Sequence, residues 1–166
     1  MQELIIKNVK TAQFNDVNLN KIFDPETKHS KSFEFQKSDV ASPYMAKEGK
    51  LAIKFYTLAP GKSNYPYHWH TGIEEVFYII SGTATLKTPQ GDRIVSEGDL
   101  IVFPANENGA HQLTNHSDAP LVYLDIDTVD TREVAFYPDT NKVRVMTGDF
   151  FKSFEIESEV NYLHGE

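Results

Sequence analysis

Residues 68–82 read His-Trp-His-Thr-Gly-Ile-Glu-Glu-Val-Phe-Tyr-Ile-Ile-Ser-Gly, and this stretch decides the expected fold and chemistry. Residues 75–80 are rich in β-branched and aromatic side chains, and the run ends at Ser81-Gly82. Such a run, bounded by turn residues, predicts a short strand. Because the run is almost continuously apolar, we expect both faces of this strand to be covered.

Similar short runs continue on both sides of this stretch. Turn residues separate them, among them Pro60-Gly61, residues 89–92 and Pro104. A helical period is hard to find, whereas short β-rich segments at regular spacing are typical of an all-β sandwich or barrel. We therefore expect strands at residues 51–58, 75–80, 83–87, 93–95, 100–103, 111–115 and 121–126.

The two histidines at the start of the stretch predict a metal site. In an extended chain, residues two apart point to the same side, so His68 and His70 project together and Trp69 points away. If the strand that begins at Glu75 pairs antiparallel to the strand of the two histidines, the Glu75 carboxylate lies near both imidazoles. Imidazole and carboxylate ligands together suit a divalent transition metal. His111, at the start of another expected strand, offers a third imidazole, and such a set leaves two octahedral positions open.

The spacing of these residues resembles the two motifs of the cupin superfamily. The first motif is matched by Gly61, six residues, His68-Trp-His70, four residues, Glu75, six residues and Gly82, with one residue more than usual before His68. The second is matched by Gly98, five residues and Pro104, and then by His111, three residues and Asn115. The loop 105–110 between these two halves is two residues longer than the family pattern. The resemblance covers about residues 51–127, and the C-terminal part is similar to small, single-domain, type-2-like bacterial cupins.

This resemblance implies an all-β, single-domain double-stranded β-helix, a jelly-roll barrel. We expect residues 1–50 to form an N-terminal arm with extra strands, residues 51–127 the barrel core, and residues 128–166 a C-terminal extension of the same domain. The resemblance also implies that His68, His70, Glu75 and His111 face the interior and hold one divalent metal, either Fe, Mn, Ni or Zn. A barrel that keeps the motif without metal is the alternative, although buried, unpaired imidazoles and carboxylates are costly.

Strand parity and motif spacing predict further site residues. Parity predicts that an apolar pocket beside the metal is lined by Phe55, Phe77, Ile79 and Leu113. Asn115 is predicted either to orient a ligand from behind or to form a turn, with equal weight. Glu74 competes with Glu75 for the ligand role, and the spacing to Gly82 favours Glu75.

Composition excludes several classes of function. The chain has 166 residues, a net charge of −8, three arginines and no cysteine. An acidic chain without a basic stripe is poorly suited to nucleic acid, and the longest apolar run is far shorter than the ~20 residues that a membrane helix needs. The lack of cysteine removes disulfides and thiolate chemistry. We expect a cytoplasmic protein that binds no nucleic acid and no membrane.

Two functions remain open. The first is a metal-dependent enzyme acting on a small molecule, of the dioxygenase, decarboxylase or isomerase type, which makes an oxidoreductase or isomerase possible without identifying a catalytic residue. Sugar phosphates fit less well, because no Arg or Lys falls at a predicted inward position. The alternative is a non-catalytic module that binds or senses a small molecule and acts through a partner protein. Apolar segments in both flanks favour a homodimer.

Overall fold

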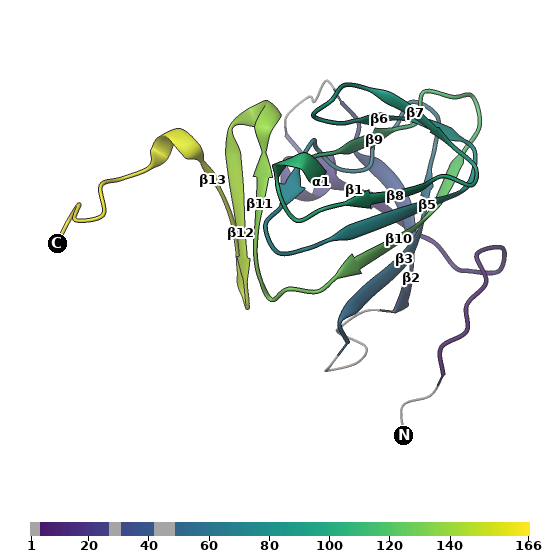
Figure 1. Ribbon diagram of the computed structural model, residues 1–166, viewed down its shortest axis with the longest axis horizontal. Coiled ribbons are helices and arrows are strands. Elements are labelled where there is room, and N and C mark those ends of the chain that lie inside the picture. Colours follow the sequence, from purple (N-terminus) through teal and green to yellow (C-terminus); the bar gives the residue numbers. More distant parts are fainter. Residues whose placement is uncertain (1–3, 27–30, 42–48) are drawn as a thin grey trace.

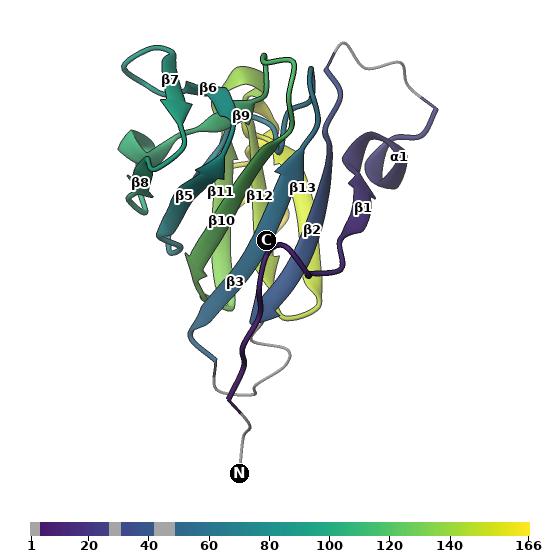
Figure 2. The same ribbon diagram turned by 90° about the vertical axis from the view of Figure 1, so that its right-hand side faces the viewer.

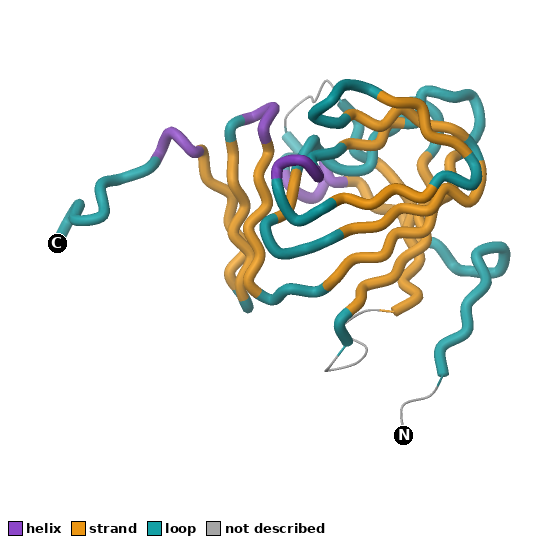
Figure 3. The backbone as a smooth tube through the Cα atoms, viewed as in Figure 1, coloured by secondary structure: helices purple, strands orange, loops and turns teal. Residues whose placement is uncertain are grey.

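The computed structural model describes residues 4–26, 31–41 and 49–166. In these residues nearly all regular structure is β-strand, together with one five-residue helix, α1 (Leu19–Phe23), and the short 3-10 helices η1 (Glu107–Gly109), η2 (Pro138–Thr140) and η3 (Ile156–Ser158). The expected all-β class is confirmed (Figures 1 and 3). No helix in the described residues is long and apolar enough to cross a membrane.

The strands of the described residues form three sheets, whose arrangement can be followed in Figure 2. The first has six strands in the order β1 (Asn15–Asn18), β2 (Glu34–Ala41), β3 (Leu51–Leu58), β10 (Leu121–Thr128), β5 (Glu75–Ser81) and β8 (Leu100–Phe103). The second contains β7 (Arg93–Ser96), β6 (Thr83–Lys87) and β9 (Gln112–Thr114). The third contains β13 (Phe150–Glu155), β12 (Lys142–Thr147), β11 (Arg132–Tyr137) and β4 (Trp69–His70).

The strands of the barrel lie within one or two residues of the expected ranges, because turn residues fix their ends. Gly82 turns β5 into β6 with a φ of 89°, and a Cβ at this position would lie 2.7 Å from the Pro120 carbonyl oxygen. Gly109, in the long loop before His111, is equally confined, since a Cβ there would lie 2.1 Å from the Pro104 carbonyl oxygen. Only glycine fits these two positions without displacing the backbone.

The strand that carries His70 does not pair with the strand that begins at Glu75, so the conditional pairing considered from the sequence is wrong. β4 pairs with β11, through Ala135 opposite His70 and Phe136 opposite Trp69. β5 instead lies between β10 and β8. Residues 71–74 carry the chain from the third sheet to the first, and His68 forms an antiparallel bridge with His111.

The core lies between the sheets and is rich in aromatic side chains. It includes Phe35, Tyr56, Leu58, Phe77, Ile79, Phe103, Leu113, Leu121 and Tyr123. On β3 the inward residues are Lys54, Tyr56 and Leu58, so the expectation that Phe55 points inward is wrong. Phe55 lies opposite Leu124 on the half-buried outer face, while its neighbour Lys54 lies opposite the buried Asp125.

The segments outside the barrel core differ in how they attach to it. On the N-terminal side, β2 extends the first sheet beside β3. On the C-terminal side, β11 to β13 form a separate layer at the left of Figure 1, and the residues after β13 run away from the sheets. β11 pairs with the strand that carries His70, so the C-terminal segment is part of the framework around the predicted site.

Candidate metal centre

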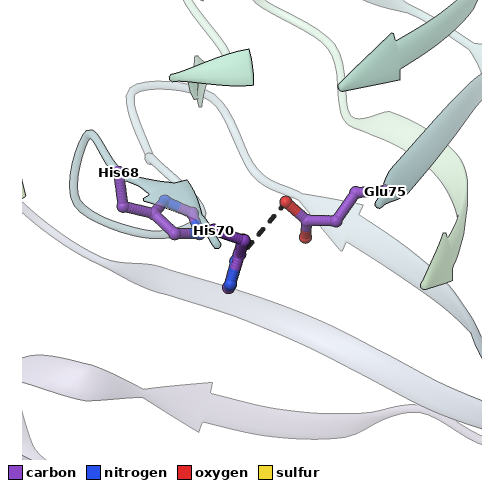
Figure 4. A group of neighbouring side chains, drawn as sticks. All are labelled: His68, His70 and Glu75. Carbon is purple, nitrogen blue, oxygen red and sulfur yellow. Dashed lines mark ion pairs between the residues drawn. The ribbon is translucent and has the colours of Figure 1, made fainter. Parts of the chain in front are cut away.

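The four side chains expected to bind metal come together between the sheets. His68 and His70 flank Trp69 on β4, Glu75 opens β5, and His111 precedes β9. The Oε2 atom of Glu75 lies 3.5 Å from Nε2 of His70 and 3.4 Å from Nε2 of His111. Figure 4 shows the His70–Glu75 ion pair with His68 beside it. The ring of His68 lies 4.9 Å from the rings of both His70 and His111.

Each imidazole is fixed by an oxygen atom on the side away from Glu75. The Nδ1 atom of His68 lies 2.8 Å from the Pro66 carbonyl, and that of His111 lies 2.9 Å from the Gly109 carbonyl. Because a carbonyl oxygen only accepts, both Nδ1 atoms must donate a proton. The lone pair of each ring is then on Nε2, which is the atom that a metal would bind.

A carboxylate fixes His70 in the same way. Oε1 of Glu133, on β11, lies 3.2 Å from Nδ1 of His70 and accepts a hydrogen bond from the Thr71 amide at 2.9 Å. Its Oε2 accepts from the Gly72 amide at 2.9 Å. Glu133 is 2% exposed. Sequence reasoning missed this residue, because it lies 58 positions beyond Glu75 and no motif spacing points to it.

The surroundings shift the pKa values of the three imidazoles in different directions. Burial, followed by the neighbouring His111 and His70, lowers the pKa of His68 well below its usual value. Burial also lowers the pKa of His111, although the charge of Glu75 opposes this effect. Burial alone would lower the pKa of His70 as well, but its contacts with Glu133 and Glu75 raise the pKa above the usual value. His68 and His111 are therefore neutral at pH 7, the state that ligation needs.

Aromatic rings form the walls around the imidazoles. Phe103 stacks on His111 with the ring centres 3.8 Å apart, and Phe77 meets His111 edge to face at 5.4 Å. Tyr137, at the end of β11, stacks on His68 at 5.9 Å. Burial raises the pKa of the Tyr137 hydroxyl, while the adjacent Arg144 partly offsets this rise. The hydroxyl therefore stays protonated and can donate a hydrogen bond.

A buried ionic cluster lies next to Glu75 on β10 and β3. A carboxylate oxygen of Asp125 and one of Asp127 lie within 4.8 Å of an oxygen of Glu75. The ammonium of Lys54 lies 3.7 Å from Asp125 and 2.5 Å from Asp127. Burial and the charge of Asp127 raise the pKa of Asp125 well above its usual value. Sequence reasoning also missed this cluster.

The remaining predicted residues lie in different places. Phe77 contacts His111 directly, whereas Ile79 and Leu113 are fully buried in the core. Asn115 forms a turn: its amide donates to the carbonyls of Leu58 and Ala119 at 2.8 Å, and its oxygen accepts from Ser117. The bonds with Ala119 and Ser117 lie within the turn, and the bond to Leu58 ties this turn to the end of β3, so these contacts fit the role of a turn former. Glu74 is exposed.

The donor set fits a divalent transition metal. Nε2 of His111 is buried and has no hydrogen-bond partner among the described residues, which is costly unless something else binds it. Atoms of His68, His70 and Glu75 lie within 4.8 Å of one another, and His111 joins them through Glu75. Three imidazole nitrogens and one carboxylate oxygen are ligands that Fe, Mn, Ni and Zn accept.

Comparisons with known proteins agree with this geometry. Residues 54–127 match the family of the cupin domain. No curated protein matches the chain. Among solved structures, a sugar phosphate isomerase from a cupin superfamily of Silicibacter pomeroyi has a TM-score of 0.71 at 20% identity and covers 91% of this chain and 92% of its own.

Two further solved structures show the same fold at lower similarity. A predicted oxalate decarboxylase from Thermotoga maritima has a TM-score of 0.59 at 16% identity and covers 77% of this chain and 100% of its own. The polyketide cyclase RemF from Streptomyces resistomycificus has a TM-score of 0.55 at 16% identity, with coverage of 76% and 81%. At these identities the likeness establishes the double-stranded β-helix fold alone, and this part of the sequence-based expectation is confirmed.

Proposed function

Because residues 54–127 match the cupin domain, we propose that His68, His70, Glu75 and His111 hold one divalent transition metal and that the protein is a metal-dependent enzyme acting on a small molecule. The observation that carries the proposal is the shared orientation of the imidazoles. Three Nδ1 atoms face oxygen acceptors, so three Nε2 atoms remain for one cation. Protein-held imidazoles of this kind bind metal best when their outer nitrogen is fixed.

The site is least enclosed beside His70 and Glu75. The side chains of His70 and Glu75 are 13% and 12% exposed, whereas His111 is only 1% exposed. Approach from solvent is therefore on the side of His70 and Glu75. A divalent metal held by His68, His70, Glu75 and His111 would supply a Lewis acid to a molecule that enters there.

The residues of this chain supply orientation and proton-holding groups. Glu133 holds His70 and the backbone of residues 71 and 72 in place. The protonated hydroxyl of Tyr137 lies over His68, and Asp125, whose neutral form is favoured by burial, lies next to Glu75. Tyr137 and Asp125 are therefore the candidates to donate a proton to, or accept one from, a bound molecule.

The alternative is a binding or sensing module without turnover, in which the same centre holds a small molecule and signals to a partner. Purified protein, stripped of metal and reloaded separately with Fe, Mn, Ni and Zn, separates the two. Oxygen uptake or conversion in a screen of small metabolites, dependent on one of these metals, supports the enzyme. Saturable binding of a metabolite with no product after long incubation supports the sensing module instead.

A homodimer is part of the same proposal. β13 is exposed along its whole length, and large apolar side chains are exposed on it and on the residues that follow. They are Phe150, Phe151, Phe154, Ile156, Val160, Tyr162 and Leu163. Several exposed apolar side chains on one segment often mark an interface. Sedimentation should give a dimer, and the change Phe154→Glu should shift it toward monomer; a wild-type monomer at high concentration contradicts this part.

A further inference from the structure

Arg144 lies on the same face of the third sheet as His70. In the register of that sheet, His70 on β4 is opposite Ala135 on β11, and Ala135 is opposite Arg144 on β12. Directly opposite residues of antiparallel strands point to the same face. Two strand spacings separate His70 from Arg144, about 10 Å between backbones. Between them in this register is the small, buried side chain of Ala135.

The other inward residues of β11 show that this face is turned toward the candidate metal centre. Glu133 and Tyr137 alternate with Ala135 on the strand, and they contact His70 and His68 respectively. Arg144 lies beside Tyr137 and affects the pKa of its hydroxyl. The guanidinium is therefore at the edge of the centre, next to a hydroxyl that can also donate.

The surroundings of Arg144 leave part of its guanidinium without a partner. Its Nε atom is buried and has no hydrogen bond within the described residues. Besides its contact with the Tyr137 hydroxyl, the guanidinium lies over the rings of Phe23, at 4.9 Å, and Phe151, at 5.9 Å. Aromatic faces hold a guanidinium in place but do not neutralise it. A buried guanidinium nitrogen without a hydrogen-bond partner calls for an acceptor, and an anion is the strongest acceptor for it.

We propose that Arg144 and the Tyr137 hydroxyl form an anion-binding subsite beside the metal centre, which takes a carboxylate or phosphate group of the small molecule. This inference rests on the proposed function, because the small molecule that the subsite holds by its anionic group is the same one that would act at the metal. A guanidinium binds the oxygens of either group in pairs, and a neighbouring hydroxyl adds a third donor. With this subsite, phosphorylated substrates become possible again. The sequence disfavoured them because strand parity placed no Arg or Lys, Arg144 included, at an inward position.

Binding of simple anions tests the subsite. Calorimetry on metal-loaded and metal-free protein would compare inorganic phosphate, malonate, and malonamide as the uncharged counterpart of malonate. The variants are Arg144→Gln and Arg144→Lys, and the matched control is Arg93→Gln, which changes an exposed arginine on β7. Circular dichroism and the metal content of each variant check that the fold and the centre are retained.

We expect at least one of the two anions to bind the wild type and Arg93→Gln about tenfold more tightly than Arg144→Gln, with Arg144→Lys in between. The binding of malonamide should not differ among them. The anion whose affinity depends on Arg144 shows whether the group is a phosphate or a carboxylate. Equal affinity of Arg144→Gln and wild type for both anions overturns the proposal. If the protein binds no metal, the proposed function fails, and the metal-free comparison still decides the role of Arg144.

Discussion

The Oε1 atom of Glu133 lies 3.2 Å from Nδ1 of His70, although the two residues are 63 positions apart. His70 belongs to the first motif of the barrel, whereas Glu133 belongs to β11, after the last barrel strand. A carboxylate behind a metal-binding imidazole fixes the ring and makes its other nitrogen a stronger ligand. The segment after the barrel therefore contributes to the proposed metal centre and does not merely pack against it.

The first prediction concerns this contact. Replacing Glu133 with alanine should weaken metal binding by about 10-fold to 100-fold, because His70 loses its fixed orientation and the Thr71 and Gly72 amides lose their acceptor. Replacement with glutamine should cost less, because its amide oxygen can still accept from Nδ1. Competition with a coloured chelator measures these affinities.

Glu155→Gln is the matched control, because Glu155 is an exposed glutamate on β13 of the same sheet. It should leave metal affinity unchanged. Metal affinity in Glu133→Ala equal to that of the wild type would show that Glu133 only supports the backbone of the loop.

The second prediction is an order of protonation in the metal-free protein. His70, whose pKa is raised, should gain its proton at a higher pH than His68 and His111, whose pKa values are lowered. Between their lowered pKa values and the usual value of about 6.5, the unfolded state binds more protons at His68 and His111, so their contribution to stability falls as the pH drops. His70 has the opposite sign: its contribution is full at low pH and is lost as the pH rises through its folded pKa.

Nuclear magnetic resonance titration of the imidazoles measures this order residue by residue. Glu133→Gln should move the titration of His70 to lower pH, because the carboxylate charge that favours its protonated form is removed. Three imidazoles titrating together near pH 6.5 would contradict the described environments.

The third prediction concerns Lys54, the buried cation beside Asp125 and Asp127. Replacing Lys54 with methionine should lower the free energy of unfolding by about 3 kcal/mol at pH 7, since buried carboxylates then lack their partner. Lys152→Met, a change of an exposed lysine on β13, should have little effect. Urea denaturation measures both, and a Lys54→Met variant as stable as the wild type would refute the assignment.

The fourth prediction compares the two phenylalanines that the sequence placed on the same side. Phe77 is 2% exposed and contacts Phe103, Tyr123 and His111, so Phe77→Ala should cost about 3–5 kcal/mol. Phe55 lies half-buried on the outer face, and Phe55→Ala should cost clearly less. The same denaturation measurements test the difference. A larger loss of unfolding free energy from Phe55→Ala than from Phe77→Ala would contradict the described orientation of β3.

Local patterns were sufficient to predict most of the barrel. Turn residues such as Gly82 end the strands where the backbone admits no Cβ, so strand positions could be read directly from the sequence. The two-residue period also places His68 and His70 together, as the structure shows. The match of residues 54–127 to the cupin domain rests on the same stretch.

The errors arose where a polar group, not an apolar one, decides which face is buried. Ile53 and Phe55 suggested the inner face of β3, but the ion pair of Lys54 with Asp125 lies inside and reverses the facing. Asn115 donates to the carbonyl of Ala119 in its own turn and to that of Leu58 on β3, a role that spacing cannot separate from ligand support. Glu133 and Arg144 reach the centre only through the pairing of β4, β11 and β12, which no local pattern encodes.

The metal content of His111→Ala tests the central claim most directly. His111 contributes the buried Nε2 atom that has no partner among the described residues, and the exposed His116, bound to Thr85 on the barrel surface, provides the matched control in His116→Ala. Mass spectrometry of the purified, dialysed proteins should find about one divalent transition metal ion per chain in the wild type and in His116→Ala, and little in His111→Ala. Equal metal content in all three proteins would contradict the proposed centre.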